Sequence, residues 1–335
     1  MANAIQTNFN YTYPGELSLE MFYAPSVQTP DITKLFTVRT GIKSKQQLAT
    51  PQVLSKIVKA YNNTGSYAGT GSPVDLTNRT IEVDDFEFRV DQRADQFEQT
   101  VLEQLLPDGV RANELGPQLR QIMVNVVLDA VRRDNFRIFS FGDKTAADAN
   151  YNMTDGLFRK LIDGVGSGVI RPDDITALGS SATTKAVAYL RNAYAQADAI
   201  LAQVEPAKKK FFVTRNIFEN YITNLEEKGN ARDGVLLVQE GIQRAFFRGI
   251  EVVPVYSWEP SLADTDNPFN TVLNTAIVYT TAENHIVGVE NAANQGEVEL
   301  WYERKDRKFY AQGRYRMGYQ YLHDGLQTIS YGIVT

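Results

Sequence analysis

A long amphipathic helix is the clearest element in the hydrophobic pattern of this sequence. Apolar residues recur at steps of three and four from Leu119 to Ala130, the spacing of one helix face. Gly116-Pro117 marks the start, because proline has no N–H to lose there and its φ is already helical. The pattern predicts a helix from Pro117 to about Phe139, spanning roughly 30 Å at ~1.5 Å per residue. We expect its buried face to comprise Leu119, Met123, Val126 and Ala130.

The C-terminal part alternates with a period of two, which is typical of β-strands. In the run 309–321, aromatic and small residues occupy one face, and mostly polar or charged residues occupy the other. This run far exceeds the usual strand length of ~5–6 residues. A shorter alternating stretch at 297–303 precedes it. We therefore expect two neighbouring strands, one of them long enough for the helix to lie across it.

Residues 33–92 have the pattern of a projecting hairpin. It begins with a predicted strand at 35–39 and a short helix at 51–61. The glycine-rich stretch 62–73 predicts a tip. An acidic helix is expected at 91–106, between the hairpin and the long helix.

The returning strand of this hairpin changes phase. Ile81 and Val83 share one phase of the alternation. Phe86 and Phe88 share the other. The slip falls at Asp84-Asp85, where we expect a β-bulge.

The first 30 residues combine helix-breaking prolines with many aromatic side chains. A disordered tail carries far less apolar surface. An extended arm of this composition needs a surface to lie on. Its own domain and a neighbouring subunit both remain open as that surface.

Residues 145–285 alternate helical and strand patterns, which predicts a mixed α/β core. Asn216 and Glu219 form a capping box, and Gly229 supplies a stop for that helix. The expected elements are helices at 156–163, 183–204 and 216–227, and strands at 211–214, 249–256 and 276–280.

Composition limits the class of protein. The chain has 335 residues, of which 43% are hydrophobic and 22% charged, as in soluble globular proteins. No apolar run approaches the ~18 residues of a spanning helix, and the first residues do not have the pattern of a secretory signal. The net charge of −6 argues against binding nucleic acid through the overall field. There is no cysteine, so disulfides and thiolate chemistry are excluded.

The sequence offers no constellation for catalysis. His285 and His323 lie far apart without metal-ligand spacing, so we expect neither a metal nor a cofactor. Adjacent acidic pairs such as Asp173-Asp174 face different ways and do not form an acid–base dyad. The glycine-rich stretch 164–168 lacks the lysine of a phosphate loop. The basic run 208–210 is expected to be solvated, with an inward-facing patch that meets phosphate as the alternative.

Several segments, taken in order, resemble the major capsid proteins of tailed double-stranded DNA phages, which have the HK97-like fold. The order of these segments carries the resemblance, which covers essentially the whole chain. They are RDNFRIFSFGD, MTDGLFRKLIDGV, FFVTRNIFENYITNL, GIEVVPVY and the C-terminal run from ENHIVGVENAANQGEVELWYERKDRKFYAQGRYRMGYQYL.

This resemblance implies an α+β fold in four parts. It has an N-terminal arm, an extended E-loop hairpin, a peripheral domain with a long spine helix and long strands, and a mixed α/β axial domain. The implied bounds are 1–32 for the arm, 33–92 for the E-loop, 93–144 with 286–335 for the peripheral domain, and 145–285 for the axial domain.

The resemblance also implies the function: self-assembly, through hexamers and pentamers, into an icosahedral shell around packaged double-stranded DNA. The protein is then not an enzyme. It is expected in the virion capsid, assembled in the host cytoplasm, with weak non-specific contact to DNA and no membrane. Further partners are a portal and separate scaffolding or decoration proteins. A shell like that of encapsulins, holding a cargo enzyme, is the nearer alternative, and an enzyme or carbohydrate-binding module is the more distant one.

Candidate contacts between subunits come from the arm, the hairpin and the polar face of the long strand. Lysines in the hairpin region (Lys43, Lys45 and Lys56) are not expected to form the cross-links of some family members. The candidates are Phe9, Tyr11, Tyr13, Phe22, Tyr67, Ile81, Val83, Phe86, Phe88, Arg314 and Arg316.

Overall fold

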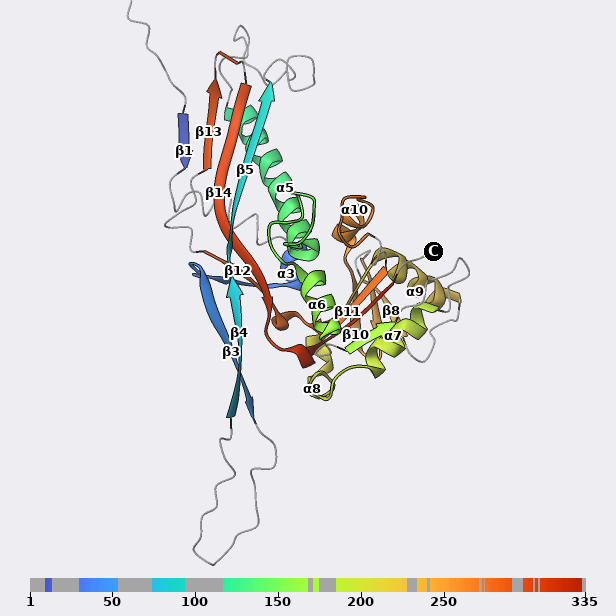
Figure 1. Cartoon of the computed structure of the whole chain (residues 1–335). Coiled ribbons are helices and arrows are strands. Elements are labelled where there is room, and N and C mark those ends of the chain that lie inside the picture. Colours follow the sequence, from blue (N-terminus) through green and yellow to red (C-terminus); the bar gives the residue numbers. More distant parts are fainter. Residues whose placement is uncertain are drawn as a thin grey trace, which may run out of the picture.

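Two β-sheets, a long helix and a projecting two-stranded ribbon make up the computed structural model (Figure 1). Among the described residues, the sheets have six and seven strands. No described helix combines the length and apolar character that a membrane span requires. The structure describes residues 10–13, 30–53, 74–93, 117–167, 171–174, 185–227, 234–239, 242–270, 273, 275–290, 298–303, 305–306 and 308–332.

The six-stranded sheet is built around one long strand, β14 (Lys308–Tyr321), as the alternation predicts. Met317 pairs with both Asp84 and Val289, so β5 and β12 lie on opposite edges of β14. The length of β14 therefore lets β13 and β12 share one edge while β5 occupies the other. The remaining strands are β1 (Asn10–Tyr13), β2 (Thr37–Thr40), β5 (Asp84–Arg93), β12 (His285–Val289) and β13 (Val298–Glu303).

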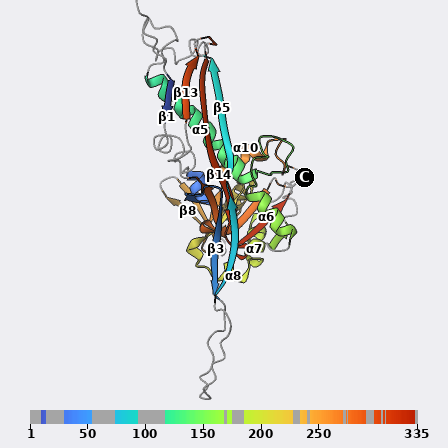
Figure 2. The same ribbon diagram turned by 60° about the vertical axis from the view of Figure 1, so that its left-hand side comes forward.

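The predicted long helix is α5 (Pro117–Phe141), which runs alongside β14 and β5 in both views (Figures 1 and 2). The predicted buried face is wrong at Val126 and Ala130, which are exposed. The side chains of Leu119 and Met123 lie outside the described residues. The face that packs on the sheet is Val127, Leu128 and Val131, against Ala311, Phe88 and Tyr315.

The seven-stranded sheet is the mixed α/β unit, and it contains four strands beyond the three that the sequence predicts for residues 145–285. Its second strand, β15, comes from the C-terminal segment that was assigned to the peripheral part. In order across the sheet, the strands are β6 (Arg171–Asp174), β15 (Gln327–Gly332), β11 (Thr275–Thr281), β7 (Lys209–Val213), β10 (Ile250–Pro254), β9 (Ile242–Phe247) and β8 (Gly234–Gln239).

Helices pack on this sheet around an aromatic cluster in which Phe211 stacks on Tyr279 with ring centroids 4.2 Å apart. The single helix predicted at 183–204 is two helices, α7 (Lys185–Ala195) and α8 (Ala199–Gln203). The break has a local cause, because Asp198 accepts a hydrogen bond from the N–H of Ile200 and caps α8. The helix that begins near Asn216 is α9 (Arg215–Glu227).

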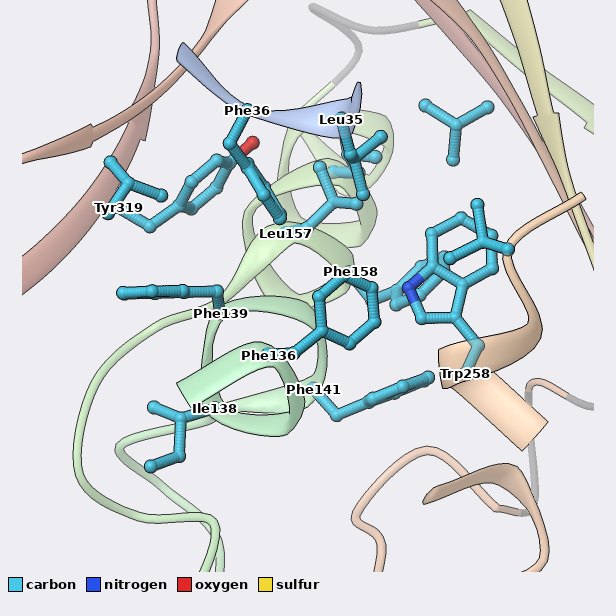
Figure 3. Packing of buried hydrophobic residues seen from close by; sticks show 14 of the residues in the cluster. Leu35, Phe36, Phe136, Ile138, Phe139, Phe141, Leu157, Phe158, Trp258 and Tyr319 are labelled. Carbon is cyan, nitrogen blue, oxygen red and sulfur yellow. The ribbon is translucent and has the colours of Figure 1, made fainter. Parts of the chain in front are cut away.

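The core at the end of α5 contains a dense group of aromatic rings (Figure 3). Phe158 of α6 (Leu157–Gly166) contacts Phe141 and Trp258, with ring centroids 5.0 and 5.1 Å apart. The indole N–H of Trp258 donates to the hydroxyl of Ser140, so its polar atom is satisfied. This cluster holds α5 and α6 against the turn that contains Trp258.

The ribbon pairs β3 (Lys45–Val53) with β4 (Val74–Glu82) and points away from the rest of the described chain (Figures 1 and 2). The helix predicted at 51–61 is wrong for residues 51–53, which belong to β3; the rest lies outside the described residues. Similarly, β5 extends to Arg93, where an acidic helix was predicted. The predicted bulge is a break one residue earlier, at Val83.

Short elements complete the described chain. The strand predicted at 35–39 is shifted to β2, because a helical turn occupies residues 30–35. These elements are α3 (Pro30–Leu35), α10 (Glu259–Leu262), and the 3-10 turns η4 (Pro206–Lys208), η5 (Tyr256–Trp258), η6 (Ala282–Asn284) and η8 (Asp324–Leu326).

Candidate functional site

Both histidines make hydrogen-bonding contacts within the subunit. His285 is fully buried, and its Nδ1 lies 2.8 Å from the hydroxyl of Tyr319. Burial lowers the pKa of His285 to about 3, because the imidazolium would lose its hydration. His323 accepts a hydrogen bond from the N–H of Gly325 in the η8 turn. No group of three or more metal-binding side chains gathers among the described residues.

Lys160 is a partly buried amine where α6 meets β14. It donates to the carbonyl of Tyr319, and its Nζ lies 5.5 Å from the centre of the Tyr319 ring. Desolvation lowers the pKa of Lys160 to about 8. This contact joins α6 to β14 beside the base of the ribbon.

The basic run 208–210 is largely engaged within the subunit. Lys209 is buried and donates to the carbonyl of Ala202. Lys210 lies 3.6 Å from Glu251. The prediction of a solvated run is therefore wrong for these two residues, and only Lys208 is exposed.

The base of the ribbon lies directly against β14. A Cβ atom at Gly318 would collide with the carbonyl of Glu82, so only glycine permits this approach. Gln320 donates to the carbonyl of Thr80 over 2.8 Å. Arg79 forms an ion pair with Asp324, and its guanidinium lies 4.3 Å from the centre of the Tyr321 ring.

Ion pairs hold the chain on both sides of the break at Val83. Lys45 pairs with Glu82 at 2.5 Å across the ribbon, and Lys144 pairs with Asp84 at 3.0 Å. The N–H of Val83 donates to the carbonyl of Ser44. Individual exposed ion pairs contribute little. Together with the backbone contacts, they fix where the chain leaves β14 for the ribbon.

Two predicted intersubunit contacts, Ile81 and Phe86, are buried within their own subunit. Ile81 packs with Ile42, Leu48 and Ile286. Phe86 stacks on Tyr315, with ring centroids 5.8 Å apart. The prediction that these side chains contact a neighbouring subunit is wrong. Within the same subunit, β12 covers Ile81 and β14 covers Phe86.

Val83 and Phe88 are partly buried in the same two clusters. Phe88 is paired with Gly313 in the sheet, and its ring centroid lies 6.4 Å from that of Tyr315. Each keeps only part of its surface exposed. They are therefore weaker candidates for intersubunit contact than the sequence indicates.

The two arginines of β14 reach back to β5. Arg316 forms ion pairs with Asp85 at 2.5 Å and with Glu290 at 3.4 Å. The hydrogen bond from Arg316 lowers the pKa of Asp85. Arg314 lies 3.4 Å from Asp85 and is much more exposed than Arg316. Arg314 remains a candidate contact, whereas Arg316 acts mainly inside the subunit.

The aromatic residues of the N-terminal segment are described only in part. Tyr11 and Tyr13 lie in β1, which pairs with β13 of the same chain. Phe9, Phe22 and Tyr67 lie outside the described residues. Whether the arm also contacts a second copy stays a prediction.

A cleft that the sequence did not predict opens beside α5. It has a volume of about 620 Å³ and separates α5 from the η5–α10 turn and from Tyr151. Its three arginines all come from α5. The lining residues are Asp129, Arg132, Arg133, Asp134, Phe136, Arg137, Tyr151, Ser257, Pro260, Ser261 and Asp264.

Solved structures of virus-like shells share this fold. A chain of the satellite phage P4 procapsid that includes the size determination (Sid) protein matches with a TM-score of 0.57 at 12% identity, over 95% of this chain and 97% of that chain. The capsid of a native GTA particle matches with a TM-score of 0.53 at 11% identity, over 92% and 91%. The capsid of Myoviridae phage XM1 matches with a TM-score of 0.52 at 10% identity, over 89% and 90%.

The comparison of sequences gives a different result. No protein-family model matches this chain, and no curated protein matches its sequence. At 10–12% identity, the structural likeness establishes the fold, which is the HK97-like capsid fold of mixed α and β structure. Fold does not by itself imply function.

Proposed function

We propose that this protein is the major capsid protein of a tailed phage, a structural subunit that assembles into the shell around a double-stranded DNA genome. One observation carries the proposal: a capsid fold is retained from end to end, over 95% of this chain and 97% of the matched procapsid chain. A capsid fold kept over nearly all of both matched chains favours a role carried by surfaces between subunits.

In this proposal, the ribbon of β3 and β4 is the E-loop and α5 is the spine helix. The six-stranded sheet is the peripheral domain and the seven-stranded sheet is the axial domain. The pairing of β5 with β14 and of β15 with β11 moves these strands out of the parts that the sequence assigned to them.

The projecting ribbon is the main physical support for assembly. A two-stranded ribbon is marginal in water when nothing covers it. This ribbon has nine paired positions, and the contacts to its own subunit that involve described residues lie at its base. Laying the outer half on an adjacent copy covers the ribbon and repeats the same contact around each ring.

The proposed partners follow from a closed shell. Copies of the chain form hexamers and pentamers, with a portal at one vertex and separate scaffolding or decoration proteins where they are used. The enclosed DNA makes weak, non-specific contact, consistent with a net charge of −6. Assembly takes place in the host cytoplasm.

Expression of the chain, followed by sedimentation and negative-stain electron microscopy, tests the proposal. Hollow shells of uniform size are expected, and a monomer at high concentration would contradict the proposal. The contents of particles purified from infected cells separate the two kinds of shell. Nuclease-protected DNA supports a phage capsid, whereas a protein cargo without DNA indicates an encapsulin-like compartment.

A further inference from the structure

The cleft beside α5 is a polar recess lined by three arginines and three aspartates, and one of the arginines has no ion-pair partner among the described residues. Arg132 pairs with Asp129 at 2.9 Å, and Arg137 pairs with Asp134 at 3.1 Å. Arg133 lines the same cleft and is exposed. It forms no ion pair with any other residue in the described part of the chain.

No carboxylate of a described residue on the opposite wall of the cleft forms an ion pair with Arg133. Asp264 accepts a hydrogen bond of 2.7 Å from the hydroxyl of Tyr151. The guanidinium of Arg137 lies 5.4 Å from the centre of the Tyr151 ring. Its Nε is buried and has no hydrogen-bond partner among the described residues. The cleft therefore has unmet capacity to donate hydrogen bonds to an anionic group.

Three exposed apolar side chains lie close in sequence to lining residues of the cleft. Val126 precedes Asp129 on α5, Met153 follows Tyr151, and Tyr256 adjoins Ser257. They are three of the five large apolar side chains that the described chain exposes, the others being Val90 and Tyr194. Exposed apolar groups beside a charged recess are typical of a protein–protein contact.

We propose that this cleft binds an acidic segment of a second copy of the chain, with Arg133 as the anchoring cation. The inference rests on the proposed shell, in which every subunit meets further copies. The chain supplies the complementary charge, having 40 acidic and 34 basic residues. Glu205, Glu226 and Glu283 are examples of exposed carboxylates that pair with no other described residue.

Nucleic acid fits the cleft less well. The lining carries as many aspartates as arginines, and only Arg133 among these arginines has no ion-pair partner in the described chain, which suits a single carboxylate better than a run of phosphates. The exposed apolar side chains would gain nothing from phosphate. A protein segment that presents one carboxylate and some apolar surface satisfies both features.

Charge reversal at the anchor tests this surface. Arg133→Glu is compared with wild type and with Lys305→Glu, which makes the same charge change in the exposed turn between β13 and β14. The readouts are the yield of sedimenting shells and the melting temperature of the unassembled subunit. We expect Arg133→Glu to lower shell yield by about tenfold or more, the effect of ~1.4 kcal/mol per contact. The melting temperature should stay unchanged, Arg133→Lys should retain part of the yield, and Lys305→Glu should assemble normally.

Other outcomes overturn the proposal. Wild-type yield from Arg133→Glu shows that the cleft holds no second copy. Normal yield with less packaged DNA assigns the cleft to phosphate instead. Equal losses in Arg133→Glu and Lys305→Glu reflect net charge and remove Arg133 as an anchor. If the wild-type protein forms no shells, the proposed function fails, which is distinct from failure of the cleft alone.

Discussion

Gly318 of β14 lies against the backbone carbonyl of Glu82, at the position where the ribbon leaves the six-stranded sheet. The two residues are far apart in sequence, and their approach leaves no room for a side chain. The hydrogen bond from Gln320 to Thr80 continues the same contact. The base of the ribbon is therefore part of the folded subunit.

The first prediction concerns this close approach. Gly318→Ala should destabilise the subunit by about 1–3 kcal/mol, because the added methyl group must push the ribbon away from β14. Chemical denaturation measures the change. Gly166→Ala is the matched control, since a Cβ there meets nothing within 4 Å, and it should be neutral or stabilising by up to about 1 kcal/mol. Equal stability of Gly318→Ala and wild type would show that the contact is loose.

The second prediction separates two adjacent valines of α5. Val127 is 3% exposed, whereas Val126 is 59% exposed. Val127→Asp should cost about 3 kcal/mol or more, because it buries an unpaired carboxylate against Ala311 and Tyr315. Val126→Asp should leave the subunit folded, with nearly wild-type unfolding in urea. The reverse order would mean that the helix packs by the face the sequence first indicated.

The third prediction concerns acid. The pKa of His285 is about 3 in the folded subunit and near 6.5 when exposed. Between these values the unfolded chain binds a proton that the folded chain does not. The free energy of unfolding is therefore unaffected by the protonation of His285 above pH 6.5. It falls as pH falls from 6.5 toward 3, by up to about 1.4 kcal/mol per pH unit.

His285→Gln should remove this part of the acid slope while keeping a polar group near Tyr319. The measurement is the free energy of unfolding of the subunit at several pH values between 3 and 7. His323→Gln, at the η8 turn, is the matched control for the substitution itself. Identical slopes for wild type and His285→Gln would show that His285 is protonated or solvated in the folded protein.

Local periodicity predicted the elements that are long and regular. The helix from Pro117 and the alternation of β14 were both readable, because each repeats one period over many residues. The buried face of α5 was not readable. Val126 and Val127 are adjacent, so the helix face that contains either valine fits a spacing of three and four. Packing against β14 decides that the face with Val127 is the buried one.

Pairing between distant segments explains the other differences. The pairing of β5 with β14 joins residues more than 200 positions apart, and no local pattern specifies it. For this reason the sequence indicated Phe86 as a contact between subunits, although Tyr315 of the same subunit covers it. The cleft was missed for the same reason. Arg133 becomes part of a site only when Tyr151 and the η5–α10 turn fold opposite α5.

The arm gives a fourth prediction. Deleting residues 2–24 removes β1, a four-residue strand that pairs only with β13 among the described residues. The truncated subunit should keep a nearly wild-type melting transition, since the central strands and α5 remain. Shell yield should fall. A truncated subunit that does not fold would place the arm in the core of its own subunit.

Hydrogen exchange on the ribbon tests most directly whether copies of this chain hold one another in a shell. Amides of the outer ribbon, 49–53 and 74–78, should exchange rapidly in isolated subunits and become protected in assembled shells. Amides of β5 provide the internal control, because their pairing with β14 should protect them equally in both states. Equal protection of the outer ribbon in subunits and shells would mean that no neighbouring copy covers it, and would contradict assembly through the ribbon.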